Sequence, residues 1–287
     1  MTGEVGHWRA LIAQIVMAIT VMAMTITIAP ALAATRLEGR LIQGGLVIGT
    51  TMPGSTVTLD GRAVRVGADG LFLFGFNRDA AAAALAITAP DGTVDRRQLI
   101  VEARRYDIQR IDGLLPKTVS PPLEILARIR REGAQIKAAR MQDTPVPYFK
   151  TGFEWPAWGR ISGVYGSQRI LNGKPRRPHL GVDIAARTGT PIVATAGGIV
   201  RIAHSGMFFT GKTVAIDHGH GLVSIYAHMS KVSAKNGQRV AKGVPIGEVG
   251  ATGRVTGPHL HWGVSWFKTR LDPALLVGPM RPAEPQR

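Results

Sequence analysis

The chain of 287 residues contains no cysteine. Disulfide bonds, thiolate zinc sites and a cysteine nucleophile are therefore excluded, and any zinc ion must bind to nitrogen and oxygen ligands. Acidic residues are also scarce, because 19 Asp and Glu accompany 35 Lys and Arg, for a formal net charge of +16. Such an excess fits either a solvated basic surface or an anionic partner, such as nucleic acid, lipid headgroups or cell-wall polymer. The charge alone does not decide among these.

One long uncharged run lies near the N-terminus. It extends from Ala10 to Ala29 behind Arg9, and a small-x-small sequence follows at Ala31 to Ala33. This pattern is typical of a secretory signal peptide cleaved after Ala33, within a segment 1–33. Because about 20 apolar residues span a bilayer, an uncleaved membrane anchor is the alternative. Both interpretations place the rest of the chain outside the cytoplasm, in the periplasm or secreted, which disfavours nucleic acid as a partner.

The segment after the signal combines short alternating runs with glycine turns. Three Asp-Gly pairs, beginning at Asp60, Asp69 and Asp91, separate runs of alternating apolar and polar residues. Asp-Gly between such runs favours β-hairpins. We therefore predict that residues 36 to about 104 form a small β-sandwich, within an accessory domain 34–116. The segment contains no histidine, so we assign it no chemistry.

A helical linker is predicted over 117–150. Ser120 precedes two prolines, which favours a helix that starts there and runs from about Pro121 to Met141. Its many arginines and lysines indicate a solvated connector rather than a binding helix. Pro145 and Pro147 mark the entry into the last domain, 151–287.

The last domain is predicted to be antiparallel and β-rich. Short apolar runs punctuated by glycine follow one another closely, at 191–194, 198–200, 213–216 and 222–226. Runs this short and close leave no room for crossover helices. The predicted fold class is thus mainly β, with a small N-terminal β-sandwich-like domain, a helical linker and a C-terminal antiparallel β domain.

Five residues in this domain have the side chains of an open zinc site. His259 and His261 alternate in a predicted strand, so their imidazoles should share one face. Without thiolates, a catalytic zinc ion needs imidazole and carboxylate ligands, and His179, Asp183 and His261 make up such a set. His228 and His259 would then hydrogen-bond the reacting groups and move protons. Together these residues fill the roles that amide hydrolysis requires.

The motifs around these residues resemble a known family. The sequences HLGVD at 179–183, YAHMS at 226–230 and GPHLH at 257–261 are similar to those of the lysostaphin-type (LytM) zinc metallopeptidases. The resemblance continues through GTPIVA at 189–194, IDHG at 216–219 and GATG at 250–253, and it covers about residues 155–275.

This resemblance implies a C-terminal peptidase domain of LytM type that cuts the peptide cross-links of peptidoglycan with Zn²⁺. The family's metal ligands fall on His179, Asp183 and His261, and its catalytic histidines on His228 and His259. Two loop segments depart from the family pattern: 166–179, which is long and basic with Arg169, and 207–209. These departures leave the substrate preference open.

Other residues receive structural interpretations. His204, His218 and His220 lie in or near glycine turns, where an imidazole is most often solvated or bonded to backbone. Trp262 should face away from His261 and belong to the core.

Two alternatives to a wall endopeptidase remain at this point. One is a zinc peptidase that acts on a protein or peptide outside the wall. The other is a regulator of wall hydrolases that kept the fold without the activity, although every predicted ligand is present. Association with a membrane through the N-terminal segment is a further prediction.

Overall fold

The computed structural model describes residues 35–280. The predicted signal or anchor segment 1–33 therefore lies outside the described residues. Among the residues that are described, no helix is long and apolar enough to cross a membrane. Contacts group the chain from Thr35 onward into one compact unit.

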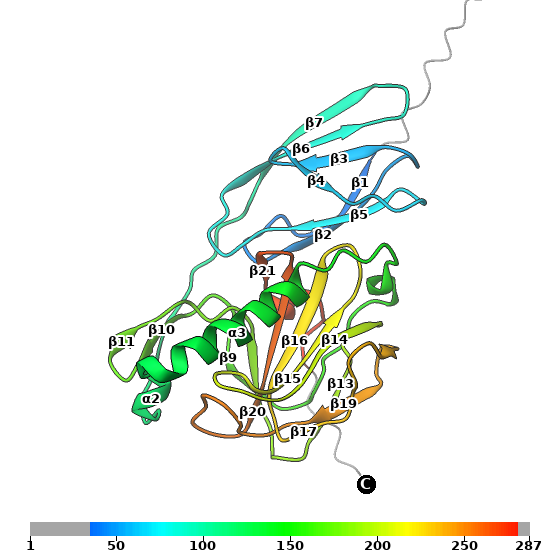
Figure 1. The fold of residues 1–287 in the computed structure, drawn as a ribbon. Coiled ribbons are helices and arrows are strands. Elements are labelled where there is room, and N and C mark those ends of the chain that lie inside the picture. The colour runs from blue at the N-terminus through cyan, green and yellow to red at the C-terminus, as the bar shows by residue number, and fades with distance from the viewer. Residues whose placement is uncertain (1–34, 281–287) are drawn as a thin grey trace, which may run out of the picture. The chain divides into compact units, whose positions relative to one another are not determined.

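Two antiparallel sheets form the first part of the chain (Figure 1). They contain the strands β1 (Arg36–Gly39), β2 (Leu46–Thr50) and β5 (Leu71–Gly75) in one sheet, and β4 (Arg62–Val64), β3 (Thr56–Leu59), β6 (Ala82–Thr88) and β7 (Val94–Ile100) in the other. Apolar residues of both sheets share one core, in which Phe72 and Phe74 are fully buried. The predicted sandwich is thus confirmed. The alanine run 80–84 leads into β6 and forms its start.

One long helix connects the two β-rich parts. A short helix, α2 (Pro116–Val119), precedes the long helix α3 (Leu123–Arg140). The predicted helix is confirmed within two residues at its start, but the predicted Ser120 cap is wrong. Pro122 occupies the N-cap position, while Ser120 ends α2. A 3₁₀ turn, η1 (Tyr148–Thr151), follows.

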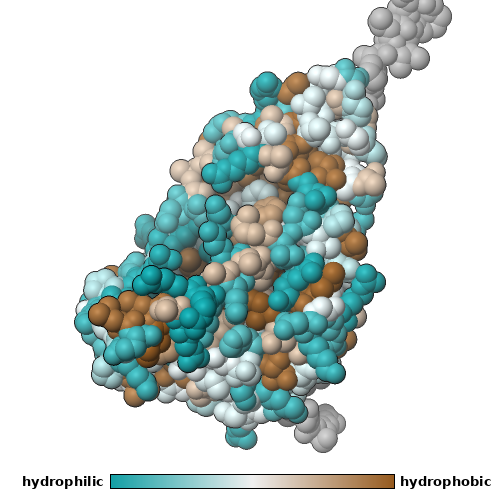
Figure 2. All heavy atoms as spheres, viewed as in Figure 1, coloured by the Kyte–Doolittle hydropathy of each residue, from teal (hydrophilic) through white to brown (hydrophobic). Residues whose placement is uncertain are grey.

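Helix α3 is not a solvated connector. Ala139 is buried against Ile202, Val223 and Ile225 of the large sheet, and Ile136 packs on the same cluster. Arg128, Arg130 and Arg131 of α3 are exposed, whereas Arg140 is half-buried. In Figure 2, hydrophobic residues gather over α2 and the start of α3, where Leu115 and Leu123 are exposed.

An eight-stranded antiparallel sheet forms the centre of the last part. Its strands, in spatial order, are β18 (Arg239–Val240), β14 (Gly198–Met207), β15 (Gly211–Asp217), β16 (Leu222–Met229), β20 (His259–Trp266), β12 (Val182–Ala185) and β9 (Arg160–Gly163), with β21 (Thr269–Leu271) paired to β20. The mainly β fold class is confirmed. A 3₁₀ turn, η2 (Pro273–Leu275), follows β21.

Two smaller sheets lie beside the large one. The first pairs β13 (Pro191–Val193), β19 (Pro245–Glu248) and β17 (Lys231–Val232). The second contains β11 (Lys174–Pro175), β10 (Gln168–Leu171) and β8 (Ile108–Ile111). Strands β8 and β10 pair in parallel, so a segment that precedes the helix joins the sheet system of the C-terminal part.

The large sheet has an apolar face and a face that carries functional groups. Leu260, Trp262 and Tyr226 are fully buried on the first face. Because side chains alternate along a strand, the residues between them point the other way, toward the side on which α3 packs. Asp183 and His261 belong to this second face. The predicted core position of Trp262 agrees with this arrangement.

Candidate active site

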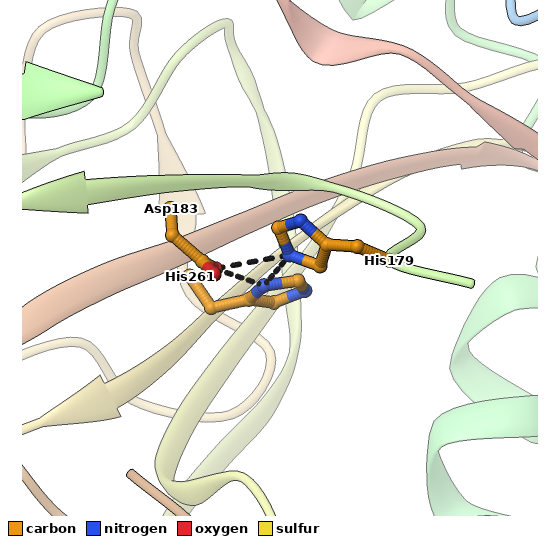
Figure 3. Close-up of side chains that lie close together, drawn as sticks. All are labelled: His179, Asp183 and His261. Carbon is orange, nitrogen blue, oxygen red and sulfur yellow. Dashed lines mark hydrogen bonds and ion pairs between the residues drawn. The ribbon is translucent and has the colours of Figure 1, made fainter. Parts of the chain in front are cut away.

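The structure brings the three predicted metal ligands together. Asp183 of β12 and His261 of β20 are direct partners in register, so their side chains share one face. His179 lies in the loop that leads into β12. Figure 3 shows the three side chains converging. His179 Nε2 lies 3.0 Å from Asp183 Oδ1 and 3.0 Å from His261 Nδ1, and His261 Nδ1 lies 2.8 Å from Asp183 Oδ1.

The hydrogen bonds of this cluster fit a bound cation. His179 Nδ1 lies 3.1 Å from the carbonyl oxygen of Val164, which can only accept, so this nitrogen carries the ring proton. His179 Nε2 therefore presents a lone pair to the Asp183 carboxylate, which is also an acceptor. At 3.0 Å, the two atoms are satisfied either by a metal cation between them or by a proton on Nε2 that His179 donates to Asp183. A proton-bearing Nδ1 on backbone is also the usual arrangement of metal-binding histidines.

The spacing and ionisation of the donors suit zinc as well. With bonds of about 2.0–2.1 Å, tetrahedral ligand atoms lie roughly 3.3 Å apart, close to the separations found here. Burial alone would raise the pKa of the Asp183 carboxyl, but hydrogen bonds from His179 and His261 hold that pKa well below its usual range. Burial lowers the pKa of His261 to about 4, against the opposing effect of Asp183. At neutral pH the cluster thus presents a carboxylate on Asp183 and a neutral imidazole on His261, which are the protonation states that metal binding requires.

His228 reaches this face through a break in strand geometry. Its neighbour Ala227 is the register partner of His261, so regular alternation would direct His228 to the opposite face. Two residues of β16, Ala227 and His228, instead face one residue of β15, Thr213, which is a β-bulge.

The backbone of His228 also has a φ of 66°, in the left-handed region that non-glycine residues rarely adopt. As a result its ring lies 4.8 Å from the ring of His259 and 6.1 Å from that of His261, centroid to centroid. Strain of this kind concentrates at functional sites.

His228 and His259 are oriented in the same way. His228 Nδ1 lies 2.8 Å from the carbonyl oxygen of Thr252, and His259 Nδ1 lies 2.9 Å from that of Gly257. Both Nδ1 atoms therefore carry protons, and both Nε2 atoms remain as proton acceptors. His259 Nε2 lies 3.9 Å from Asp183 Oδ1. Burial, together with the neighbouring His259 and His261, lowers the pKa of His228 to about 3, so its ring is neutral.

Two glycines leave room for the cluster. A Cβ atom at Gly181 would lie 2.7 Å from His261 Cε1 and 2.6 Å from the carbonyl oxygen of Trp262. A Cβ atom at Gly163 would lie 2.6 Å from Asp183 Oδ2. Neither glycine has the positive φ that would require glycine for conformational reasons. Glycine is needed at both positions because any larger side chain would press on Asp183 or His261.

Two cavities border the cluster, with volumes of about 390 and 160 Å³. His228 lines both, and Arg169, Leu171 and Arg254 do so as well. The smaller cavity is also lined by Gln109, Ile111 and Leu114, which come from the segment before the helix. Nothing in the sequence pattern of that segment indicates pairing with β10, so its part in the site is not predictable from the sequence.

The remaining histidines of the described residues have structural contacts. His218 is fully buried, with Nδ1 bonded to the Gly197 carbonyl oxygen and Nε2 to the Ser224 hydroxyl. His220 Nε2 lies 2.9 Å from the carbonyl oxygen of Pro145. His204 Nδ1 accepts a hydrogen bond from the amide of Gly206.

Comparisons with known proteins show the family of the chain. Residues 177–273 match Peptidase family M23. A solved Pseudomonas aeruginosa protein assigned to peptidase M23 is 30% identical with a TM-score of 0.63, and the match covers 84% of this chain and 96% of that one. Because nearly the whole of that relative is matched, the chain belongs to peptidase family M23.

Two curated relatives match the same region. Peptidoglycan DD-endopeptidase ShyA of Vibrio cholerae is 40% identical over 104 residues, which cover 36% of this chain and 24% of that protein. DD-carboxypeptidase/endopeptidase Mpg of Neisseria meningitidis is 40% identical over 124 residues, or 42% of this chain and 28% of that protein. The chain thus spans less than a third of the length of these relatives.

Proposed function

We propose that this protein is a zinc-dependent endopeptidase that hydrolyses the peptide cross-links of peptidoglycan. The observation that carries the proposal is the convergence of His179, Asp183 and His261 on one point, beside a second pair of histidines with free Nε2 atoms. Membership of peptidase family M23 and the name of the relative Mpg support an endopeptidase activity, and the name of the relative ShyA supports peptidoglycan as the substrate.

The side chains divide between holding a metal ion and moving protons. His179, Asp183 and His261 would hold a zinc ion, which when bound supplies the Lewis acid and the activation of water that amide hydrolysis needs. The Nε2 atoms of His228 and His259 can take up a proton from the attacking water. The N–H formed in this way can then donate to the developing oxyanion or pass its proton to the leaving nitrogen.

The site favours an active enzyme over a regulator that lost catalysis. Such a regulator has no need for the left-handed backbone at His228, which places an imidazole on the metal-facing side of the sheet. A peptidoglycan substrate also requires an extracytoplasmic location, periplasmic or secreted, for which the N-terminal segment would serve as signal or anchor. We also propose the division into an accessory domain (34–116), a helical linker (117–150) and a peptidase domain (151–287).

Digestion of purified peptidoglycan tests the proposal. The full chain, metal-free or loaded with zinc, is incubated with purified sacculi, and the soluble and residual muropeptides are identified by mass spectrometry. We expect cross-linked dimers to be converted into monomers by the zinc-loaded protein alone. If the folded, zinc-loaded protein leaves every cross-link intact but cleaves peptides from a general library, the substrate is a non-wall peptide and the proposal is wrong.

A further inference from the structure

Four arginines surround the candidate active site. Arg169, Arg176, Arg177 and Arg254 all line the 390 Å³ cavity that also contains His179, His228 and His261. Arg169 belongs to β10, Arg176 and Arg177 to the loop between β11 and β12, and Arg254 to the loop before β20. The first three lie in the basic segment 166–179, which departs from the family pattern.

The positive charge in this cavity is poorly compensated. Arg169 forms an ion pair with Asp183, which is itself a candidate metal ligand. Within residues 35–280, no ion pair joins Arg176, Arg177 or Arg254 to a carboxylate. Burial, with the neighbouring Arg169 and Arg176, lowers the pKa of Arg254 from its usual value. The guanidinium groups therefore repel one another, and an anion in the cavity would relieve that repulsion.

Helix α2 holds two of these guanidinium groups in place. Arg176 donates to the carbonyl oxygen of Val119 at 2.9 Å, and Arg254 donates to that of Thr118 at 3.4 Å. The Arg254 guanidinium also lies over the ring of Phe209, 4.7 Å from its centroid. Each contact uses only part of the five N–H donors of an arginine, so others remain for a ligand. The fork of a guanidinium matches a carboxylate with two parallel hydrogen bonds.

We propose, resting on the proposed function, that Arg176, Arg177 and Arg254 with Arg169 form a carboxylate-binding subsite. This subsite selects peptides with a free carboxylate on a residue next to the scissile bond over the same peptides with that group amidated. A carboxylate is the anionic group that peptides offer, and the subsite shares its cavity with the histidines proposed to cleave them. Neutral cross-bridges are accordingly poor substrates.

A pair of isosteric substrates tests the subsite. Two cross-linked peptides are synthesised that differ only in a carboxylate or a carboxamide beside the scissile bond, and kcat/KM is measured for each with the zinc-loaded full chain. Uncleavable versions of both are titrated into the same protein to obtain Kd. Because a hydrogen bond to a charged group contributes about 1.5–3 kcal/mol, we expect a preference for the carboxylate of about 10- to 100-fold in both measurements.

Three variants assign the preference to the arginines. Arg254→Gln and Arg177→Gln should reduce it to within about threefold, because each slows the cleavage of the carboxylate peptide much more than that of the amidated peptide. Arg177 is exposed and has no hydrogen bond among the described residues, so its replacement leaves folding intact. Arg187→Gln, at an exposed position that lines neither cavity, should keep the full preference.

The results separate the subsite from the proposed function. Equal cleavage of both peptides by the wild type overturns the subsite and leaves the endopeptidase intact. Selective binding of the uncleavable carboxylate peptide, without cleavage of either substrate, supports the subsite and overturns the proposed function. A preference that survives both Arg254→Gln and Arg177→Gln also overturns the assignment.

Discussion

Gly181 lies two residues from both His179 and Asp183, and its missing side chain leaves space for His261, the third proposed metal ligand. A Cβ atom here would press on the His261 ring and on the carbonyl oxygen of Trp262. The carbonyl belongs to the β20 backbone and cannot move away without disturbing the strand.

We therefore expect Gly181→Ala to weaken zinc binding by about 10- to 100-fold, the usual effect of disturbing the support of a metal ligand. Competition with a chromophoric chelator measures the change. Gly206→Ala serves as the control, because a Cβ atom there meets nothing within 4 Å. Unchanged zinc affinity in Gly181→Ala would show that the His261 position is not tightly constrained.

His218 illustrates a histidine used for stability. Both of its ring nitrogens are bonded inside the core, and burial lowers its pKa to about 4. In the unfolded chain the pKa is about 6.5, so below that pH the unfolded state takes up a proton that the folded state excludes. The stability that neutral His218 provides is complete above pH 6.5 and is lost as the pH falls toward 4.

For the metal-free protein, this single group should cost about 2 kcal/mol of unfolding free energy between pH 7 and pH 5. Urea unfolding of the wild type and of His218→Gln at both pH values measures the effect. We expect His218→Gln to be less stable than the wild type at pH 7. Between pH 7 and pH 5, however, its free energy of unfolding should fall by about 2 kcal/mol less than that of the wild type. Equal losses in the two proteins would mean that His218 does not titrate as its burial implies.

At the scale of single elements, the β-bulge in β16 decides whether the site is complete. The ligand motifs could be read from the sequence because alternation in β20 places His259 and His261 on one face. The same rule applied to β16 would have directed His228 away from the site. Its motif match was the only signal for a role, since no local pattern predicts the bulge or the left-handed backbone at that position.

The segment before helix α3 shows another limit of the sequence. The hairpins of the sandwich, the strands of the large sheet and the extent of α3 follow from turn residues and short-range periodicity. Pairing of β8 with β10 joins Ile108–Ile111 to Gln168–Leu171, about 60 residues away. No sequence pattern in either segment predicts that the two strands pair. The lining of the smaller cavity by Gln109 and Ile111 could therefore not be predicted.

A glycine-to-alanine substitution in helix α3 tests which of its residues face solvent. Gly133 lies on an exposed face of the helix, and a Cβ atom there meets nothing within 4 Å. Gly133→Ala should raise the free energy of unfolding by about 0.5–1 kcal/mol, because alanine has the higher helix propensity.

The matched control is Gly173→Ala, in the turn between β10 and β11. That glycine also has open space around it, but its φ is +75°, which disfavours alanine. Thermal unfolding of both variants should thus show shifts of opposite sign. A destabilised Gly133→Ala would contradict the placement of this residue on the solvent side of α3.

At the scale of the whole molecule, the basic charge and the fold serve the same proposed substrate. The net charge of +16 favours association with anionic wall polymer through long-range attraction, and four of the arginines concentrate it at the candidate active site. The large sheet supplies a rigid support, because its other face is a dry core under Leu260 and Trp262. The composition left open whether the positive charge is a solvated surface or binds an anionic partner, and the four arginines around one cavity favour an anionic partner there.

The proposed function divides the work within one strand, with His261 binding metal and His259 moving protons beside it. Zinc content and the release of muropeptides from sacculi are measured together for the full-length wild type, His261→Ala and His259→Ala. We predict that His261→Ala loses both zinc and activity. His259→Ala should keep most of its zinc and lose about 10²- to 10⁴-fold in turnover, the usual contribution of a positioned acid or base. Equal loss of zinc in the two variants, or full turnover in His259→Ala, would contradict the account.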